Sequence, residues 1–483
     1  MISGFIRSML KWEPKFQVYS KILKAVFVFL FVFCLNASAF CAPVNPVSKA
    51  IDNTELGRNS IISVDVKDLK TGNTVFSRRP NTFLNPASSL KVFTMAAALD
   101  TLGEKYHFET VFYIDNDKNV YLKLGGDPLF TSSNLDALIK SLKQAYNGKI
   151  KNFYIDDTVI DKIPYSDGWT VDDYWPNSPK LSPYIVDNNT VKVNFALSKN
   201  GKNIEIFQNN DYKFSFINEL EIGTTTNIIP ALNYGEISGI VSLTGTLSGD
   251  ISKEFPVLDT ARFFAVKLRK ALDNNGISYS KPFYQKRVPK DAKRIASFRR
   301  PLKVVLSYIL KTSNNFATEA VFKVAGGVWF DKAKMTENAP EVLKNVKRGS
   351  FEAGKLMFFE YYEKAGLKTD KINLKDASGV SRYNTLSTSW MSDALIYLDK
   401  NSTIKDYMIT SGEGTLCRRM RDLAGNLKAK TGTIFGVSSL TGYITSLNSV
   451  DYAFAIIIQN FSERASVVKG LEDDIVNGIY FLE

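Results

Sequence analysis

The sequence has almost no histidine and very little cysteine. His107 is the one histidine among 483 residues, and Cys34, Cys41 and Cys417 are the three cysteines. A zinc site built from several histidine and cysteine ligands is therefore excluded, and so is a fold that depends on many disulfides. A mechanism based on histidine would have to use His107.

Long hydrophobic runs are also scarce, and the one at the N-terminus is short. It covers residues 25–35, follows two lysines and precedes Ala37-Ser38-Ala39. Such a run is too short to span a bilayer as a helix, whereas a basic flank and an Ala-x-Ala end are typical of a signal peptide. We expect residues 1–39 to be a signal peptide that is cleaved after Ala39, and the mature protein to be periplasmic. Cys41 and Cys417 would then remain and could pair.

The net charge is positive, but no basic block stands out. The chain has 61 Lys and Arg against 49 Asp and Glu, which gives a formal net charge of +12. Residues 1–39 carry five basic side chains and one acidic one, so the mature charge is about +8. We interpret this as surface charge spread for solubility. An exported protein meets anionic envelope polymers and lipid headgroups first, so we expect no nucleic-acid partner and allow loose association with a membrane surface.

Apolar periodicity predicts a β-hairpin over 60–76 and then a helix that starts at Asn85-Pro86 and stops at Gly103. Residues 109–294 differ, because short strands and turn residues dominate there. Further helices are predicted over residues 135–146, 260–274, 302–324, 351–365 and 388–398. Three strands, over residues 427–431, 436–445 and 452–459, precede a last helix that ends near Phe481.

This order of elements predicts an α/β fold in which an antiparallel sheet, built from both chain ends, is covered by helices. The catalytic part would comprise residues 43–108 and 295–483. Residues 109–294 would form an inserted β-rich region of one or two domains, with two nested domains as the arrangement that we favour.

Three short motifs could carry chemistry, although each is weak alone. Ser88 and Lys91 form a Ser-x-x-Lys motif in the first turn of the helix after Pro86. Ser313 and Asn315 form a Ser-x-Asn motif between two apolar helical runs, and residues 430–433, Lys-Thr-Gly-Thr, end a strand. Each pattern recurs elsewhere in the chain, where a solvated helix face, a capped turn or a hairpin turn explains it.

The order of the motifs is more specific than any one of them, because serine β-lactamases and penicillin-binding proteins carry closely similar triplets. The sequence resembles this superfamily. Within it, the sequence resembles the class C low-molecular-mass penicillin-binding proteins, the D-alanyl-D-alanine carboxypeptidase/endopeptidase family. The resemblance covers essentially the whole mature chain. The matching stretches are residues 85–91, 125–128, 186–189, 376–384, 412–420 and 428–433.

The resemblance implies a serine hydrolase with a serine β-lactamase/transpeptidase-like domain that acts on peptidoglycan stem peptides. Ser88 would attack the carbonyl between two D-alanines and form an acyl-enzyme that water later cleaves. Because the chain has a single histidine, Lys91 is the candidate base, and it can act only if its pKa is lowered by desolvation and by the like charge of Lys430. Ser313 would relay a proton to the leaving amine.

The other motif residues would bind the substrate. Asn315 would hold the substrate amide, and Lys430 and Thr431 would bind the terminal carboxylate. The backbone N–H groups of Ser88 and Thr433 would form the oxyanion hole. The implied partners are peptidoglycan peptides and β-lactam antibiotics, and no metal or organic cofactor is implied.

An aromatic run, Trp169 to Trp175, lies within the predicted insertion and contains two aspartates. An ordinary loop anchored on the core would explain it. In the family, however, this region folds back over the cleft and contacts the side chain of the peptide. Asp172 is then the candidate to face a substrate ammonium, such as that of diaminopimelate.

Two alternatives stay open. A serine β-lactamase would use the same serine and lysine but deacylate fast. The spacing of 225 residues between Ser88 and Ser313 is far too long for a compact class A β-lactamase. A non-catalytic peptidoglycan-binding protein would keep the fold without needing all three motifs, and here none is degraded. Carboxypeptidase and endopeptidase activity cannot be separated, since both cleave after the same D-alanine carbonyl.

Overall fold

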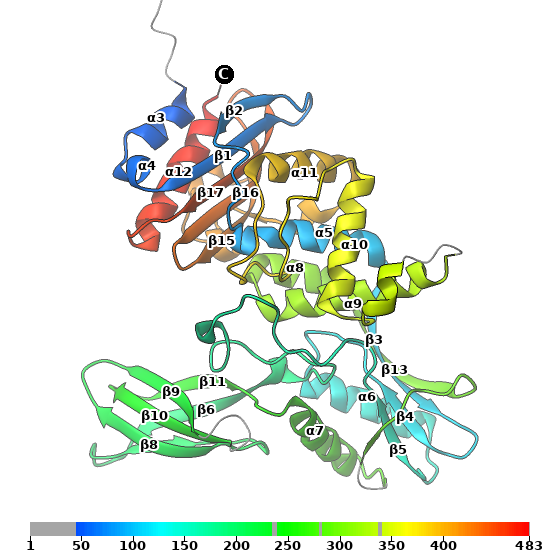
Figure 1. Cartoon of the computed structure of the whole chain (residues 1–483). Coiled ribbons are helices and arrows are strands. Elements are labelled where there is room, and N and C mark those ends of the chain that lie inside the picture. Colours follow the sequence, from blue (N-terminus) through cyan, green and yellow to red (C-terminus); the bar gives the residue numbers. More distant parts are fainter. Residues whose placement is uncertain (1–44, 234–238, 280–282, 337–340, 483) are drawn as a thin grey trace, which may run out of the picture.

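The structure is a computed structural model and describes residues 45–233, 239–279, 283–336 and 341–482 (Figure 1). The predicted signal peptide and Cys41 lie outside these residues, so the question of whether Cys41 pairs with Cys417 lies outside them too. Cys417 is exposed and forms no disulfide with another described residue. No helix in the described part of the chain combines the length and apolarity that a membrane crossing requires.

A six-stranded antiparallel sheet forms the centre of the catalytic part, with the strand order β14-β15-β16-β17-β1-β2. β1 pairs with β17 from Ile61 opposite Gln459 to Asp68 opposite Tyr452. Strands from the two ends of the chain are therefore neighbours, as the order of elements predicted. The strands are β1 (Ile61–Asp68), β2 (Thr74–Arg78), β14 (Ile409–Thr410), β15 (Leu427–Ile434), β16 (Val437–Thr445) and β17 (Asp451–Gln459).

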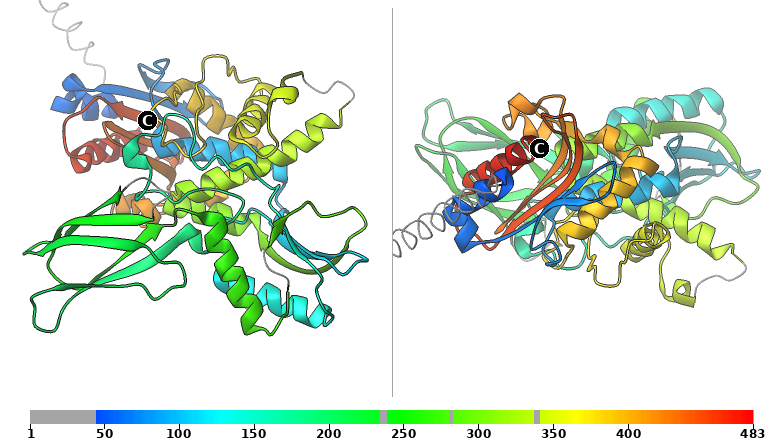
Figure 2. Two further views of the ribbon diagram at one scale, coloured as in Figure 1. Left: turned by 60° about the horizontal axis from the view of Figure 1, so that its bottom comes forward. Right: turned by 90° about the horizontal axis from the view of Figure 1, so that it is seen from above.

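The central strands are buried on both faces, because helices cover each side of the sheet (Figure 2). In β17, Phe454 and Ile456 join the core under α3 (Pro46–Asp52) and α12 (Ala465–Tyr480). Ala455 and Ile457 point the other way, into the larger core. A strand with one buried face alternates apolar and polar residues. Because β17 is buried on both faces, its sequence is an unbroken apolar run instead.

The larger core contains the helices that position the site. It is formed by α5 (Leu90–Leu102), α8 (Leu302–Thr312), α9 (Asn315–Lys334), α10 (Phe351–Lys364) and α11 (Thr388–Asn401). The run predicted as helical over 302–324 is two helices, because Ser313 has a left-handed φ of 59° between them. A short helix, α4 (Glu55–Asn59), precedes β1 and, like α3, has no counterpart among the predicted elements.

The region between the two catalytic segments contains three further sheets, in the lower half of Figure 1. A five-stranded sheet, β12-β5-β4-β3-β13, packs with the helices predicted at 135–146 and 260–274. Two three-stranded sheets, β8-β10-β9 and β11-β6-β7, lie between β5 and β12 in the chain. The division of this region into domains stays a prediction. The elements are β3 (His107–Ile114), β4 (Val120–Lys123), α6 (Ser132–Ala145), β5 (Phe153–Asp156), β6 (Thr190–Leu197), β7 (Ile204–Phe207), β8 (Ser215–Ile222), β9 (Asn227–Asn233), β10 (Ile240–Leu247), β11 (Ile251–Pro256), α7 (Thr260–Asn274), β12 (Tyr284–Gln285) and β13 (Lys293–Pro301).

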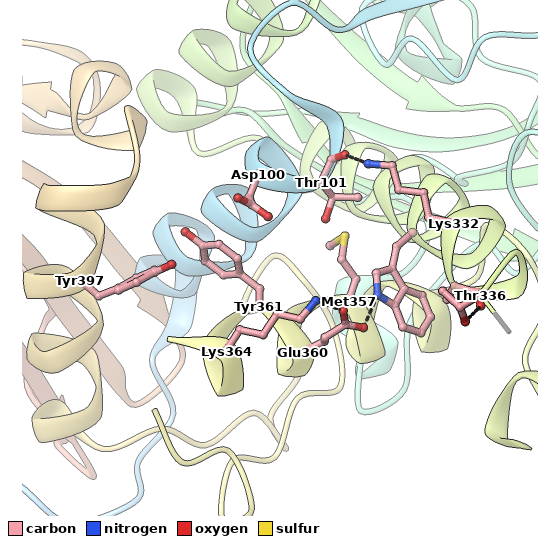
Figure 3. A pocket seen from close by; sticks show the side chains of 11 residues that line it. Asp100, Thr101, Lys332, Thr336, Met357, Glu360, Tyr361, Lys364 and Tyr397 are labelled. Carbon is pink, nitrogen blue, oxygen red and sulfur yellow. Dashed lines mark hydrogen bonds and ion pairs between the residues drawn. The ribbon is translucent and has the colours of Figure 1, made fainter. Parts of the chain in front are cut away.

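A pocket lies at the C-terminal end of α5, between α9, α10 and α11 (Figure 3). Lys332 donates to the carbonyl of Thr101 (2.9 Å), and Trp329 Nε1 donates to Glu360 (2.7 Å) across it. A helix rises about 1.5 Å per residue, so this end of α5 is roughly 20 Å from Ser88. None of the motif residues lines this pocket.

Candidate active site

Ser88 lies in a single 3-10 turn, Ala87–Ser89, directly before α5. Ala87 has a φ of 45°, a left-handed conformation that costs a non-glycine residue about 1–2 kcal/mol. Asn85 holds this turn, because its Oδ1 accepts from the Ala87 N–H (2.8 Å) and its Nδ2 donates to the Ser381 carbonyl (2.9 Å). The turn places Ser88 half-buried at the helix start, with Lys91 on the same face.

The Lys91 ammonium is fully buried and has three hydrogen-bond partners. Its Nζ lies 2.8 Å from Ser88 Oγ, 2.7 Å from Asn315 Oδ1 and 2.6 Å from the carbonyl of Ser378. Only the serine hydroxyl among these three can also donate a proton. A neutral Lys91 would therefore keep its two N–H bonds to Asn315 and Ser378, and its lone pair would face the Ser88 hydroxyl.

The environment of Lys91 favours this neutral form. Burial lowers its pKa to about 7, although the nearby carboxylates of Asp376 and Glu319 act in the opposite direction. A pKa close to the working pH is what a general base requires. His107 offers no alternative, because it begins β3 and its Nδ1 lies 2.8 Å from the carbonyl of Lys105.

A second serine and lysine pair lies where α8 meets α9. The left-handed turn at Ser313 and the cap by Asn314, whose Oδ1 accepts from the Ala317 N–H (2.7 Å), separate the two helices. Lys430 Nζ donates to Ser313 Oγ (2.8 Å) and to the carbonyl of Thr431 (2.7 Å). The same turn therefore directs Ser313 towards Lys430 and Asn315 towards Lys91. Burial, and secondarily the charge of Lys91, hold the pKa of Lys430 well below its usual value.

Strand β15 passes directly beside the turn that carries Ser88. A Cβ added to Gly432 would lie 2.7 Å from the Ser88 nitrogen and 2.9 Å from the Ser89 nitrogen, so only glycine permits this approach. Thr431 is buried and donates to Thr415 Oγ1 (2.7 Å), while Thr433 is exposed. The three motifs, far apart in the sequence, thus meet around Ser88.

The chain as a whole is similar to known proteins. The sequence pattern of the D-Ala-D-Ala carboxypeptidase 3 (S13) family matches residues 44–477. The chain belongs to this family. It is 24% identical to the "D-alanyl-D-alanine carboxypeptidase DacB" of Haemophilus influenzae, over 95% of this chain and 99% of that protein. It is therefore a D-alanyl-D-alanine carboxypeptidase, as the resemblance to this family implied.

Two crystal structures have a fold similar to that of this chain. Penicillin binding protein 4 (dacB) from Haemophilus influenzae has a TM-score of 0.76 at 24% identity, over 90% of this chain and 99% of that one. The same protein "complexed with novel beta-lactam (CMV)" has a TM-score of 0.73 at 23% identity with the same coverage. These likenesses confirm the predicted α/β fold of the carboxypeptidase. Neither alternative, a β-lactamase or a non-catalytic binding protein, is favoured by the comparisons.

Asp172 is the one predicted site residue that this geometry leaves apart. It lies in the exposed turn Val171–Asp173, and its carboxylate makes no hydrogen bond or ion pair with the described residues. The next residue, Asp173, instead pairs with Arg382 at 3.3 Å. The role of Asp172 in the carboxypeptidase stays a prediction.

Two buried carboxylates next to Lys91 were missed by the sequence reasoning. Asp376 is fully buried and Glu319 is 5% exposed, and both lie close enough to Lys91 to raise its pKa. Burial, and secondarily the charge of Asp376, raise the pKa of Glu319. Residues 376–384 were noticed as a stretch that matches the family, but neither carboxylate has a motif of its own. The signal available in the sequence was a single carboxylate followed by small residues, Asp376-Ala-Ser-Gly.

Proposed function

We propose that this carboxypeptidase cleaves the D-Ala-D-Ala bond of peptidoglycan stem peptides, with Ser88 as nucleophile and Lys91 as general base. The observation that carries the proposal is the hydrogen-bond set of Lys91. Two of its three partners, Asn315 and Ser378, can only accept from it through their carbonyl oxygens. The third is the Ser88 hydroxyl at 2.8 Å, within reach for direct proton transfer.

In the acylation step, Ser88 Oγ attacks the carbonyl carbon while its proton moves to Lys91 Nζ. The oxyanion is held by the backbone N–H groups of Ser88 and Thr433, which lie at the start of a helix and on the strand beside it. The C–N bond then breaks, and the proton passes from Lys91 through Ser313 Oγ to the leaving amine of D-alanine. The product is an ester between Ser88 and the shortened peptide.

In the deacylation step, water attacks the ester carbon and gives its proton to Lys91. The bond between Ser88 Oγ and the acyl carbon breaks, and Oγ recovers a proton from Lys91. The same base therefore serves both halves of the reaction, and no further co-reactant is required.

The other motif residues hold the substrate. Lys430 and Thr431 bind the terminal carboxylate, and a bound anion would restore the positive charge that burial disfavours on Lys430. Asn315 uses its Oδ1 to hold Lys91, which leaves its Nδ2 group to donate to a substrate amide carbonyl. Endopeptidase cleavage of cross-linked peptides would use the same bonds, since the acyl donor is identical.

A β-lactam mimics the same acyl donor, and its opened ring keeps the leaving amine tethered. The β-lactam complex of the Haemophilus influenzae relative supports this part of the proposal. The acyl-enzyme should therefore persist once formed. The substrate also indicates the localisation of the enzyme, because peptidoglycan lies outside the cytoplasm. We propose that the mature protein begins at Phe40 and is periplasmic.

The test is labelling of envelope-fraction protein with a fluorescent penicillin, followed by peptide mapping and N-terminal sequencing. We expect label on Ser88 alone, none on a Ser88→Ala variant that folds normally, and an N-terminus at Phe40. Labelling that persists in the Ser88→Ala variant would contradict the assignment of Ser88 as the nucleophile. Rapid release of free penicilloic acid would favour a β-lactamase. Cytoplasmic protein with an intact Met1 would contradict the proposed periplasmic localisation.

A further inference from the structure

One segment of the inserted region, residues 161–173, lies along the catalytic part of the molecule. It belongs to the teal chain between the two halves in Figure 1. Lys323 of α9 is 3% exposed and donates to Asp161 and to the carbonyl of Ile163, both at 2.7 Å. A buried lysine that is paired in this way fixes the start of the segment against α9.

The segment continues along residues 375–383, which follow α10. The backbone N–H of Arg382 donates to the Gly168 carbonyl (3.1 Å), and a Cβ on Gly168 would lie 2.5 Å from Cδ2 of the Tyr383 ring. Gly168 itself has a φ of 77°. The positive φ favours glycine, and the side chains of Ser381 and Tyr383 fill the space that a Cβ would need, so the two segments pack closely together.

At the centre of this contact, Trp169 donates through Nε1 to the carboxylate of Asp376 at 2.8 Å. The same carboxylate accepts from the backbone N–H groups of Gly379 (2.7 Å), Val380 (2.9 Å) and Ser381 (2.7 Å). The N–H groups from three successive residues wrap the chain into a tight turn around one buried charge. Asn384 Nδ2 also donates to this carboxylate (2.7 Å), so Trp169 is the donor that comes from the inserted region.

A second buried carboxylate holds the same turn from the other side. Glu319 Oε1 accepts from the backbone N–H groups of Ala377 (2.9 Å) and Ser378 (2.8 Å). Its Oε2 accepts from the hydroxyl of Ser166, again in the inserted segment, at 3.3 Å. Each carboxylate that shapes the turn therefore has one donor from the insertion.

The turn matters because its Ser378 carbonyl accepts from Lys91 at 2.6 Å and lies 3.4 Å from Ser88 Oγ. The charged groups that face Lys91 come from three elements: Asp376 from the turn, Glu319 from α9 and Lys430 from β15. The insertion reaches the general base through two of these three groups.

We propose that Trp169 is a positioning residue that couples the inserted region to the general base, by holding Asp376 and the Ser378 turn in place around Lys91. The proposal rests on the roles of Ser88 and Lys91 given above. It makes the insertion part of the catalytic apparatus, whatever its contacts with substrate.

The chain offers a matched control. Trp169 and Trp175 lie six residues apart, each is 9% exposed, and each donates through Nε1 at 2.8 Å. The acceptor of Trp175 is the carbonyl of Pro256, within the inserted region. Replacing either tryptophan by phenylalanine removes one donor and keeps an aromatic ring, but only Trp169 touches the turn.

The experiment measures the rate of Ser88 acylation by a fluorescent penicillin as a function of pH, together with the Tm of each variant. In Trp169→Phe, the Asp376 carboxylate loses a donor and its charge acts more strongly on Lys91. A looser turn would also admit water, and both changes raise the pKa of Lys91. We expect the acidic limb of the profile to move up by about 0.5–1 pH unit, with about two- to fivefold slower acylation at neutral pH.

Trp175→Phe should lower the Tm to a similar extent and leave the acidic limb where it is. Ser166→Ala, which removes the longer bond to Glu319, should change the position of the limb less than Trp169→Phe does. An equal, pH-independent loss of rate in Trp169→Phe and Trp175→Phe would overturn the coupling. Label that persists in Ser88→Ala would instead overturn the proposed function, so the two failures are distinguishable.

Discussion

The site contains two pairs of serine and lysine in different regions, and their surroundings differ. Ser88 and Lys91 lie one helical turn apart at the start of α5, next to the buried carboxylates of Asp376 and Glu319. Ser313 and Lys430 come from the junction of α8 and α9 and from β15, and the charge that acts on Lys430 is that of Lys91.

Both lysines are fully buried, and burial disfavours the charge on each. The carboxylates near Lys91 partly offset this effect and bring its pKa to about 7, where it can both accept and release a proton. Lys430 has no such compensation until an anion binds. If the proposed roles hold, the placement of buried carboxylates, and not burial itself, separates the base from the binding group.

The largest expected effect tests the different roles proposed for Lys91 and Lys430. Lys91→Ala should slow acylation of Ser88 by about 10³-fold or more, because a nucleophile without its base loses most of its function. Lys430→Ala should slow it by only about 10- to 100-fold, because a binding group and a proton relay partner are lost but the base remains. Rapid-mixing measurements with a fluorescent penicillin give both rates, and equal losses would contradict the division of roles.

The pH dependence of the unmodified enzyme gives a second test with a smaller effect. Lys91 must be neutral to accept the Ser88 proton, and it becomes neutral as pH rises through its pKa of about 7. Acylation should therefore increase with pH, level off above neutrality and fall about tenfold per unit well below it. A rate that is constant from mildly acidic to mildly basic pH would exclude Lys91 as the titrating base.

The smallest expected effect concerns Asp172, which would select the peptide side chain. Because its carboxylate is exposed, its attraction for a substrate ammonium is worth about 0.2–1 kcal/mol. Asp172→Asn should raise KM about two- to fivefold for peptides with a free side-chain amine. Acetylated peptides serve as the control, and an equal change for both would show that Asp172 only shapes its loop.

Much of the site could be predicted because its chemistry is local in sequence. Ser88 and Lys91 lie three residues apart on one helix, and Lys430 to Thr433 are consecutive on a strand. The helix over 260–274 was predicted with the same bounds as α7, since its apolar spacing is regular and Asp259 caps it. Local pattern was sufficient in these places.

The remaining features depend on distant partners and could not be read from spacing. Asp376 acquires its role from Trp169, which lies 207 residues away in the chain. The position of Ser313 between two apolar helical runs was read from the sequence, but its left-handed φ of 59° was not, because serine does not signal that conformation. The two-residue strand β14 exists only because β15 lies beside it.

The pairing of β1 with β17 has a consequence for folding. Ser88 precedes the inserted region and Lys430 follows it, and the strand that joins the halves of the sheet, β17, comes near the C-terminal end. Contacts between such distant segments form slowly, because the loop between them must close first. We therefore expect the inserted region to fold early and Ser88 to gain its partners late, so that an incompletely folded chain would carry Ser88 without hydrolytic power.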